Sequence, residues 1–399
     1  MLTVIEVSKL NWQRNLWCLW SGCIISSASY TMLIPFLPLY LLDLGVTGAT
    51  INLWSAIVFS VTFFISALMS PYWGRQADKS GKRRMLIRAG FSLAAAYFLG
   101  SLVRNPIELF MVRILQGFAT GFVPAALSIV ASTAPKEKIG FSLGIMQTAT
   151  LVGSIIGPLF GGTLSHLFGI RMSFIVAACI MFVGTLVVSL FVTEPTRNEV
   201  PQASGVIDDL KTAFNNLILL EMLVLLFIAQ MAVMVLQPLI TLYVAELQGQ
   251  LEGTVLISGI IFSLAGIAGA IAAPLWGKGG QKAGFSQVLI SGFLGAGLFN
   301  SLQFFVGDIW SFALLQFIFG FFIAGIYVAV NAIVVANTNG GFRGRAFGLT
   351  MSANQLGSMF GPLIGGVVSG WIGIKFIFIY TGIFLIIVGF VIWRQRGKY

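Results

Sequence analysis

Long apolar runs separated by short polar segments make up most of this chain of 399 residues. Twelve runs reach the length of about 20 residues that a helix needs to cross the hydrocarbon core of a bilayer. The predicted spans cover residues 16–40, 51–73, 85–103, 107–133, 141–166, 172–192, 218–245, 253–276, 286–306, 309–335, 345–370 and 375–394. We therefore expect an all-α membrane protein with twelve transmembrane helices.

The second half of the chain repeats a pattern of the first. Residues 153–162 carry a run of glycine, serine and proline that returns at residues 357–366, an offset of 204 (357 minus 153). A six-helix unit repeated in parallel, with its axis along the membrane normal, describes many transporters. We expect two pseudo-symmetric six-helix bundles.

The one long polar connection lies between the sixth and seventh predicted spans, at residues 193–217. It carries charges of both signs and two prolines, a composition typical of a flexible linker. The expected domains are therefore an N-terminal bundle at residues 1–192, a cytoplasmic linker at 193–217 and a C-terminal bundle at 218–399.

The repeated stretches place glycine at every fourth position of a predicted helix. Such glycines form one bare face, where a neighbouring helix can approach closely. The proline within each stretch removes a backbone donor in mid-helix, which a membrane interior tolerates only where neighbours satisfy the freed carbonyl. These predicted packing and hinge residues are Gly153, Gly157, Pro158, Gly161, Gly162, Gly357, Gly361 and Pro362.

Only 9% of the residues are charged, against roughly 25% in soluble proteins, and 57% are hydrophobic. The net charge of +10 could attract nucleic acid. However, nineteen of the 23 lysines and arginines lie in the terminal segments or in the loops on one side of the predicted membrane. Positive charge of this kind marks the cytoplasmic side. We expect both termini in the cytoplasm and no nucleic-acid partner.

Few residues could support catalysis or metal binding. His166 is the only histidine, and the three cysteines lie within apolar runs without a C-x-x-C pair. A hydrolytic Ser/His or paired-Asp site at membrane depth is missing from the sequence, as is a nucleotide-binding G-x-x-x-x-G-K-[ST] loop. We expect no enzyme activity, no metal and no cofactor.

Arg113 is the charged residue that the predicted spans place deepest in the membrane. Burying a guanidinium without compensation costs at least about 2.5–3.5 kcal/mol, so the side chain should face the bundle interior or a watered cavity. The alternative is that it snorkels to the surface. Seven residues, about 10 Å of helix rise, separate it from Pro106 at the helix start, which favours an interior role in substrate or proton binding.

No acidic residue lies in the middle of a predicted span, so the candidates for a proton path besides Arg113 sit near helix ends. Glu108 can instead pair with Arg104 at the interface, and Glu221 is expected in the first turn of its helix, where the dipole favours an acid. For Asp43 and Glu246, the alternative is a position at a solvated helix end. The four acidic candidates are Asp43, Glu108, Glu221 and Glu246.

Polar and aromatic residues within the spans are candidates for the lining of a central cavity. Phenylalanine (35 residues) and methionine (13) supply adaptable apolar walls that suit a promiscuous site. The alternative is that the polar residues bond helix to helix. The candidates are Tyr30, Thr31, Gln147, Thr150, Gln230, Gln237, Tyr327, Asn331, Asn354 and Gln355.

Three motifs together resemble a known family. Residues 74–84, between the second and third spans, resemble the cytoplasmic signature of the major facilitator superfamily. Residues 153–162 resemble its fifth-helix antiporter signature, and Arg113–Gly117 with Gly121 its fourth-helix signature. Further resemblance to the MdtG/PmrA-type branch of its bacterial drug:proton antiporters rests on segments at residues 11–16, 35–48, 54–60 and 122–124.

The resemblance implies a conformational latch formed by Gly74, Asp78, Gly81 and Arg83. In the similar family, the aspartate contacts the cytoplasmic start of helix 11, here near residues 344–347, in the outward-facing state. An anion beside a helix N-terminus is stabilised by roughly 0.3–1 kcal/mol. The alternative is a solvated turn that enforces topology and touches anionic lipid head groups.

The resemblance also implies a function. It is that of a secondary active transporter in the bacterial cytoplasmic membrane, which exports amphipathic drugs or toxic compounds in exchange for protons by alternating access. The expected partners are amphipathic small molecules, protons and membrane lipids, and we expect a monomer. Export of an endogenous lipid or metabolite is an alternative, and proton-coupled nutrient uptake is a less favoured one.

Overall fold

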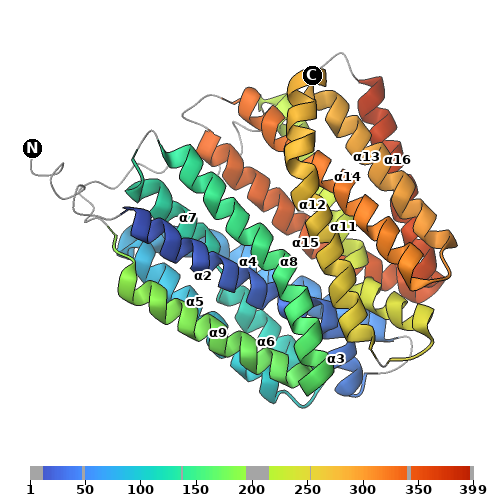
Figure 1. Cartoon of the computed structure of the whole chain (residues 1–399), viewed down its shortest axis with the longest axis horizontal. Helices are drawn as coiled ribbons and strands as arrows, with labels where there is room; N and C mark the ends of the chain where they lie inside the picture. Colours follow the sequence, from blue (N-terminus) through green and yellow to red (C-terminus); the bar gives the residue numbers. More distant parts are fainter. Residues whose placement is uncertain are drawn as a thin grey trace, which may run out of the picture. The chain divides into compact units, whose positions relative to one another are not determined.

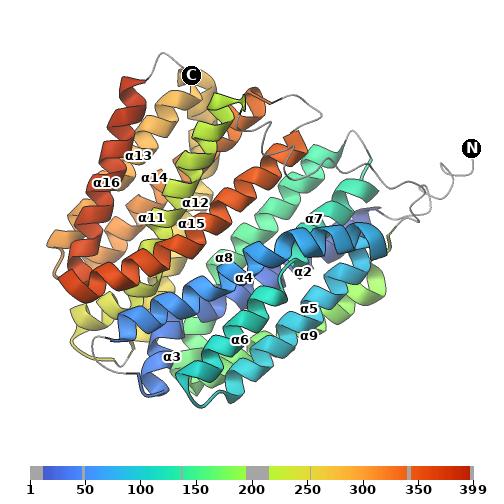
Figure 2. The same ribbon diagram turned by 180° about the vertical axis from the view of Figure 1, so that it is seen from behind.

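A computed structural model describes residues 12–46, 50–135, 138–194, 215–251, 253–338 and 343–395, apart from the side chains of residues 71, 74, 75, 78, 79, 139–141, 343–345, 347 and 348. Figures 1 and 2 show its helices from two sides. They are α2 (Trp12–Leu33), η1 (Ile34–Phe36), α3 (Leu37–Asp43), α4 (Thr50–Ser80), α5 (Lys82–Leu102), α6 (Pro106–Phe118), α7 (Phe122–Thr133), α8 (Ile139–Phe168), α9 (Ile170–Phe191), α11 (Leu217–Gln248), α12 (Thr254–Ala283), α13 (Phe285–Leu302), η3 (Gln303–Phe305), α14 (Ile309–Ala336), α15 (Arg343–Ile372) and α16 (Ile374–Arg394).

The described helices confirm the all-α membrane architecture. Eleven helical stretches in the described ranges are long and apolar enough, by length and composition, to cross a membrane. The twelfth predicted span, residues 345–370, coincides with α15, a helix of 30 residues. It carries polar residues, such as the buried Ser358.

Two predicted spans are interrupted rather than continuous. The first changes from α2 through the 3-10 segment η1 to α3, at Pro35 and Pro38, whose rings remove two backbone donors. Pro238 at the repeat-related position lies inside the unbroken α11. The span expected at residues 107–133 is divided into α6 and α7.

The segment expected as a loop after the second span is mostly helical. Helix α4 continues to Ser80, and α5 begins at Lys82, so that Gly81 alone separates them. Gly81 has φ +98° and ψ 139°, and Gly284 has nearly the same angles, φ +96° and ψ 139°, between α12 and α13. Only glycine adopts such a conformation readily. The expected loop is therefore wrong, and a one-residue turn takes its place in both halves.

Grouping by contacts divides the chain into two compact units, Met1–Phe36 with Phe64–Pro201 and Leu37–Phe63 with Gln202–Tyr399. Corresponding helices pair in the same way within each unit. Helix α2 packs against α8 as α11 packs against α15, and α5 packs against α9 as α13 packs against α16. This shared pairing is what the pseudo-symmetric repeat requires.

Residues 37–63 group with the second unit, although the repeat assigns them to the first. Helix α3 contacts α11. A Cβ added at Gly366 of α15 would lie 2.6 Å from the Asn52 carbonyl oxygen of α4. The contacts and the sequence repeat therefore assign residues 37–63 to different halves. The expected domain boundaries at residues 192 and 218 stay a prediction. Most of the expected linker, residues 195–214, lies outside the described residues.

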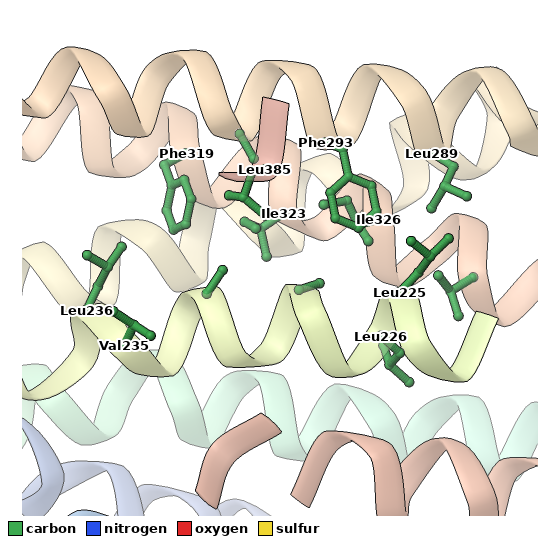
Figure 3. Close-up of a cluster of buried hydrophobic side chains, with 14 of the residues drawn as sticks. Leu225, Leu226, Val235, Leu236, Leu289, Phe293, Phe319, Ile323, Ile326 and Leu385 are labelled. Atoms are coloured by element: carbon green, nitrogen blue, oxygen red, sulfur yellow. The ribbon is translucent and has the colours of Figure 1, made fainter. Parts of the chain in front are cut away.

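A large apolar core fills the second unit (Figure 3). Leu225 and Leu236 of α11, Phe293 of α13, Ile326 of α14 and Leu385 of α16 contribute fully or almost fully buried side chains. In a bilayer, helix association depends on such close packing, because lipid tails are as apolar as leucine. The core therefore fixes the backbone on which the polar residues of this unit sit.

Candidate functional site

Arg113 lies in the interior of the first unit. It belongs to α6, where it is only 2% exposed, and its Nη1 donates a hydrogen bond of 2.7 Å to Oε1 of Gln116 one turn later. The guanidinium also interacts electrostatically with the hydroxyls of Tyr30 on α2 and Tyr97 on α5. The interior position is confirmed and snorkelling is wrong, because three helices surround the charge.

The position related to Arg113 by the repeat is occupied by a neutral residue. Gln316 of α14 accepts a hydrogen bond of 3.0 Å from Nε2 of Gln303, and both side chains are buried. Asn300, which corresponds to Tyr97, donates from Nδ2 to the Phe378 carbonyl oxygen at 2.8 Å. The buried positive charge is thus a property of one half of the repeat.

A second polar cluster joins three helices of the second unit. The Tyr327 hydroxyl of α14 donates to Oε1 of Gln230 on α11, and Nε2 of Gln230 donates to the Ser358 hydroxyl of α15 at 2.9 Å. Oδ1 of Asn354, one turn before Ser358, is buried and accepts no hydrogen bond from the described residues. The sequence predicted Gln230, Tyr327 and Asn354 as site residues but not Ser358.

The remaining predicted cavity residues are not gathered into this cluster. The Thr31 hydroxyl lies in the seam between α2 and α8, where it donates to the Gly153 carbonyl oxygen at 3.2 Å. Gln147 and Asn331 are exposed, whereas Thr150, Gln237 and Gln355 are half-buried. A substrate-contacting role for these six residues stays a prediction.

The acidic candidates occupy helix ends, as expected. Glu108 forms a capping box at the start of α6: its carboxylate accepts from the Arg104 backbone N–H at 2.7 Å and the Asn105 amide at 2.6 Å, while its own N–H donates to Oδ1 of Asn105 at 2.9 Å. Hence Glu108 is engaged with the cap rather than in the expected side-chain pair with Arg104.

The other three acidic candidates differ in their positions along the helices and in their exposure. Asp43 and Glu246 are exposed at the ends of α3 and α11. Glu221 lies in the second turn of α11 rather than in its first turn, because the helix begins at Leu217, where the Asn216 side chain accepts from the Leu219 N–H at 3.1 Å. A place for any of them on a proton path stays a prediction.

The proposed latch is only partly within the described residues. The side chains of Gly74 and Asp78, and of residues 344, 345 and 347 at the start of α15, lie outside them. Arg83 Nη2 donates to the Ser189 carbonyl oxygen of α9. A Cβ at Gly81 would lie 3.2 Å from the Glu194 carboxylate. The latch itself stays a prediction.

Glu194 holds the start of α5, although it was expected in the flexible linker. Its two carboxylate oxygens accept from the backbone N–H groups of Lys82 and Arg83 at 3.0 and 2.9 Å. The preceding residue, Thr193, exchanges two hydrogen bonds with the Asn15 side chain. Thr193 and Glu194 are therefore held by hydrogen bonds to the first unit, while the expected linker from residue 193 stays a prediction.

The glycine faces of α8 and α15 lie against neighbouring helices as predicted. A Cβ at Gly153 or Gly157 would lie 2.7 Å from the carbonyl oxygen of Ile24 or Ala28 on α2. Corresponding additions at Gly357 and Gly361 of α15 would lie 2.7 and 2.8 Å from carbonyl oxygens of α11. A Cβ at Gly161 would lie still closer to α2, against the Met32 carbonyl oxygen. Motion at Pro158, Gly162 and Pro362, the remaining predicted hinge residues, stays a prediction.

Arg88 is a polar residue whose position the sequence did not reveal. It was counted among the basic residues of the loops, but it lies within α5, half-buried, with its guanidinium 3.5 Å from the centroid of the Trp73 ring. Its Nη1 and Nη2 donate to the carbonyl oxygens of Phe118 and Thr120 at 3.3 and 2.9 Å. The signal that could have identified it is its place inside the span predicted at residues 85–103.

Comparison with known sequences gives relatives over nearly the whole chain. The profile of the Major Facilitator Superfamily matches residues 19–286 and 222–398. The chain is 36% identical over 379 residues to multidrug resistance protein MdtG of Enterobacter lignolyticus (strain SCF1), covering 94% of this chain and 90% of the relative. It is 35% identical to MdtG of Salmonella arizonae, with 93% of both chains covered.

Solved structures of transporters have the same fold. A bacterial homologue of the human lysosomal transporter Spinster, in an inward-facing and occupied conformation, superposes with a TM-score of 0.80 at 14% identity over 96% of both chains. The peptide transporter POT gives a TM-score of 0.77 at 16% identity, covering 96% of this chain and 94% of that one. The relatives are transporters rather than enzymes. Together, the profile match, the relatives and the repeated helix pairing show that the chain belongs to the Major Facilitator Superfamily.

Proposed function

We propose that this protein is a multidrug exporter of the cytoplasmic membrane, which moves amphipathic compounds outward in exchange for protons. The observation that carries the proposal is the identity of 35–36% to MdtG multidrug resistance proteins over more than nine-tenths of the chain. Substrate and proton bind in turn as the two repeated halves alternate between inward and outward states. No cofactor takes part, and the proton gradient supplies the energy.

Arg113 provides the charge at the centre of this mechanism. A buried guanidinium held by Gln116 and beside two phenols is oriented without being neutralised by these neighbours. Its field reaches far in a medium of low dielectric constant. Binding of a proton or of a charged substrate group near it therefore changes the relative energies of the two states, which is what coupling requires.

The second polar cluster suits recognition of varied ligands. Gln230, Tyr327, Ser358 and Asn354 offer donors and acceptors on three helices of the second unit. A few polar groups among apolar walls are typical of small-molecule sites. Aromatic and methionine side chains can repack around different shapes, which favours a broad range of compounds.

The test is transport by purified protein in liposomes. A fluorescent lipophilic cation serves as the probe, and its movement is followed with and without an imposed pH gradient. We expect the gradient to drive accumulation on the side from which protons leave. Movement that ignores the gradient would overturn proton antiport. The Arg113→Gln variant, which installs the residue of the second repeat, should lose most of the gradient-driven transport, and native rates in it would exclude the role of Arg113.

The same transport assay distinguishes which acidic candidate carries the proton. Asp43→Asn, Glu221→Gln and Glu246→Gln each remove one titrating group. The variant that abolishes gradient-driven uptake while retaining exchange of probe across the membrane at equal pH identifies the proton carrier. Glu108→Gln serves as the comparison, because its carboxylate is engaged in the cap of α6.

A further inference from the structure

The fourth predicted span is broken between Phe118 and Phe122. Helix α6 ends at Phe118, and α7 starts at Phe122, after Gly121 with φ +117° and ψ 0°. This left-handed conformation favours glycine. The break also lies next to Pro124, which has no N–H to donate to the carbonyl of Thr120, the residue four positions earlier. The local sequence therefore permits a break and leaves backbone acceptors without helical donors.

Arg88 and Trp73 supply the missing donors from two other helices. Arg88 donates to the carbonyl oxygens of both Phe118 and Thr120, and Trp73 Nε1 donates to the Phe118 carbonyl oxygen at 3.0 Å. The Arg88 guanidinium stacks on the Trp73 ring, so the two side chains form one unit. The Thr120 hydroxyl adds a bond of 2.9 Å to the Gly117 carbonyl oxygen and receives one from Ser66. Every one of these residues belongs to the first unit.

The second half of the chain contains an internal comparison. At the related positions, 203 residues later, Trp276 Nε1 donates to the Phe321 carbonyl oxygen at 2.9 Å, just as Trp73 does to Phe118. There, however, α14 runs unbroken from Ile309 to Ala336. The tryptophan bond alone thus does not break a helix.

What differs between the halves is the set of residues around that bond. Arg88, Gly121 and Pro124 correspond to Ser291, Ala324 and Tyr327 in the second half. The broken half therefore combines an arginine that satisfies carbonyls, a glycine that adopts the left-handed conformation and a proline that lacks a donor. The unbroken half has none of these three.

We propose that Arg88 is a positioning residue that holds the fourth span permanently broken, so that α6 and α7 act as separate segments joined by a hinge at residues 119–121. This inference rests on the proposed transport function. Both segments contact α5, but α7 also contacts α2 and α8, so the two segments differ in packing. The hinge lets α7 follow α2 and α8 during the transport cycle while α6 keeps Arg113 beside Tyr97.

The test replaces the residues of the first half that distinguish its broken span from the unbroken helix of the second half. Arg88→Ser leaves the Thr120 carbonyl without its donor, and we expect a lower melting temperature and transport at least about tenfold slower, since small misplacements of a site reduce rates strongly. The triple variant R88S/G121A/P124A can form a continuous helix. We expect it to recover melting temperature relative to R88S but not transport. Arg104→Ser, which changes an exposed arginine just after the same helix, should leave both unchanged.

A distance measurement makes the test independent of transport. Spin labels at Met111 and Ser132, both exposed, are attached in a background without other cysteines. A straight helix places these positions about 32 Å apart along its axis. We expect the triple variant to approach this value and the native protein to differ from it.

Equal distances in native and triple variants, or native transport rates in R88S or in the triple variant, would overturn the hinge. Failure of the native protein to respond to a pH gradient would instead overturn antiport, and would leave the distance result intact.

Discussion

Several charged residues in this protein form hydrogen bonds to backbone groups at helix ends, which would otherwise have no partner within the helix. Glu194 accepts from the first two N–H groups of α5, and Arg88 donates to the carbonyl oxygens of Phe118, at the end of α6, and of Thr120 just beyond it. Both follow the polarity of the helix, whose N-terminus favours anions and whose C-terminus favours cations. Arg113 differs, because its charge lies inside a helix and serves no terminus.

Removing the charge of Glu194 should weaken the start of α5. For Glu194→Gln we expect a loss of about 0.3–1 kcal/mol in the free energy of unfolding, the usual value of an anion at a helix N-terminus. The amide keeps one acceptor and loses the other, so the variant removes one hydrogen bond together with the charge. Thermal unfolding in detergent measures it, and raising the salt concentration should shrink the difference, since the site is only half-buried. An unchanged melting temperature at low salt would contradict this role.

Elements in both halves are positioned by the same two devices, which are glycine faces that admit a neighbouring helix and polar caps that begin a helix. The glycine faces set α8 on α2 and α15 on α11. Caps at Asn105 and Asp308 start the related helices α6 and α14. At Asp308, the backbone N–H of Ser311 donates to the carboxylate and lowers its pKa, so this cap is complete at neutral pH and weakens only as the pH falls through that lowered pKa.

The glycine face of α8 can be tested with a control on the same helix. In Gly157→Ala, the added methyl group would meet the Ala28 carbonyl oxygen at 2.7 Å, and we expect a loss of about 1–3 kcal/mol from overpacking. Gly144→Ala places the same group in open space and should be neutral or stabilise by about 0.5–1 kcal/mol. Equal effects of the two substitutions on thermal unfolding would show that the close approach does not limit the packing.

The capping box of α6 can be tested with a double-mutant cycle. Asn105→Ala should reduce the free energy of unfolding by about 1 kcal/mol. Glu108→Ala should reduce it by a similar amount, and the double variant should lose less than the sum, because each removes the same mutual bonds. Additive losses would show that the two residues act separately. The pH dependence of transport should stay as in the native protein in all three.

At the scale of the whole molecule, one arrangement of helices is used twice with different chemistry inside. The first unit contains the buried guanidinium and the broken fourth span. The second unit contains neutral amides at the related positions, a neutral hydroxyl–amide cluster and an unbroken α14. The fold therefore repeats while the buried charge does not.

The distribution of basic residues predicts which side of the membrane each end faces. We expect cysteines introduced at Ser8 and at Gln395 to react with a membrane-impermeant maleimide only in inside-out vesicles, because positive segments stay in the cytoplasm. Cysteine at Leu251, between α11 and α12, should react in intact cells. Labelling of Ser8→Cys in intact cells would contradict the predicted orientation.

The sequence by itself predicted the order and helical type of the membrane spans, the repeat and the glycine faces, because these depend on local hydrophobicity and on the spacing of small residues. It also placed Arg113 in the interior, since the cost of exposing its charge to lipid is large. Only the tertiary structure decided that residues 74–80 continue a helix, that Glu194 caps α5 and that Glu108 closes a capping box. It also revealed the break at Gly121, where carbonyl oxygens accept hydrogen bonds from Arg88, a residue 33 positions away. Local patterns determine which segments enter the membrane, whereas the pairing of backbone groups at helix ends is settled by side chains that come from other helices.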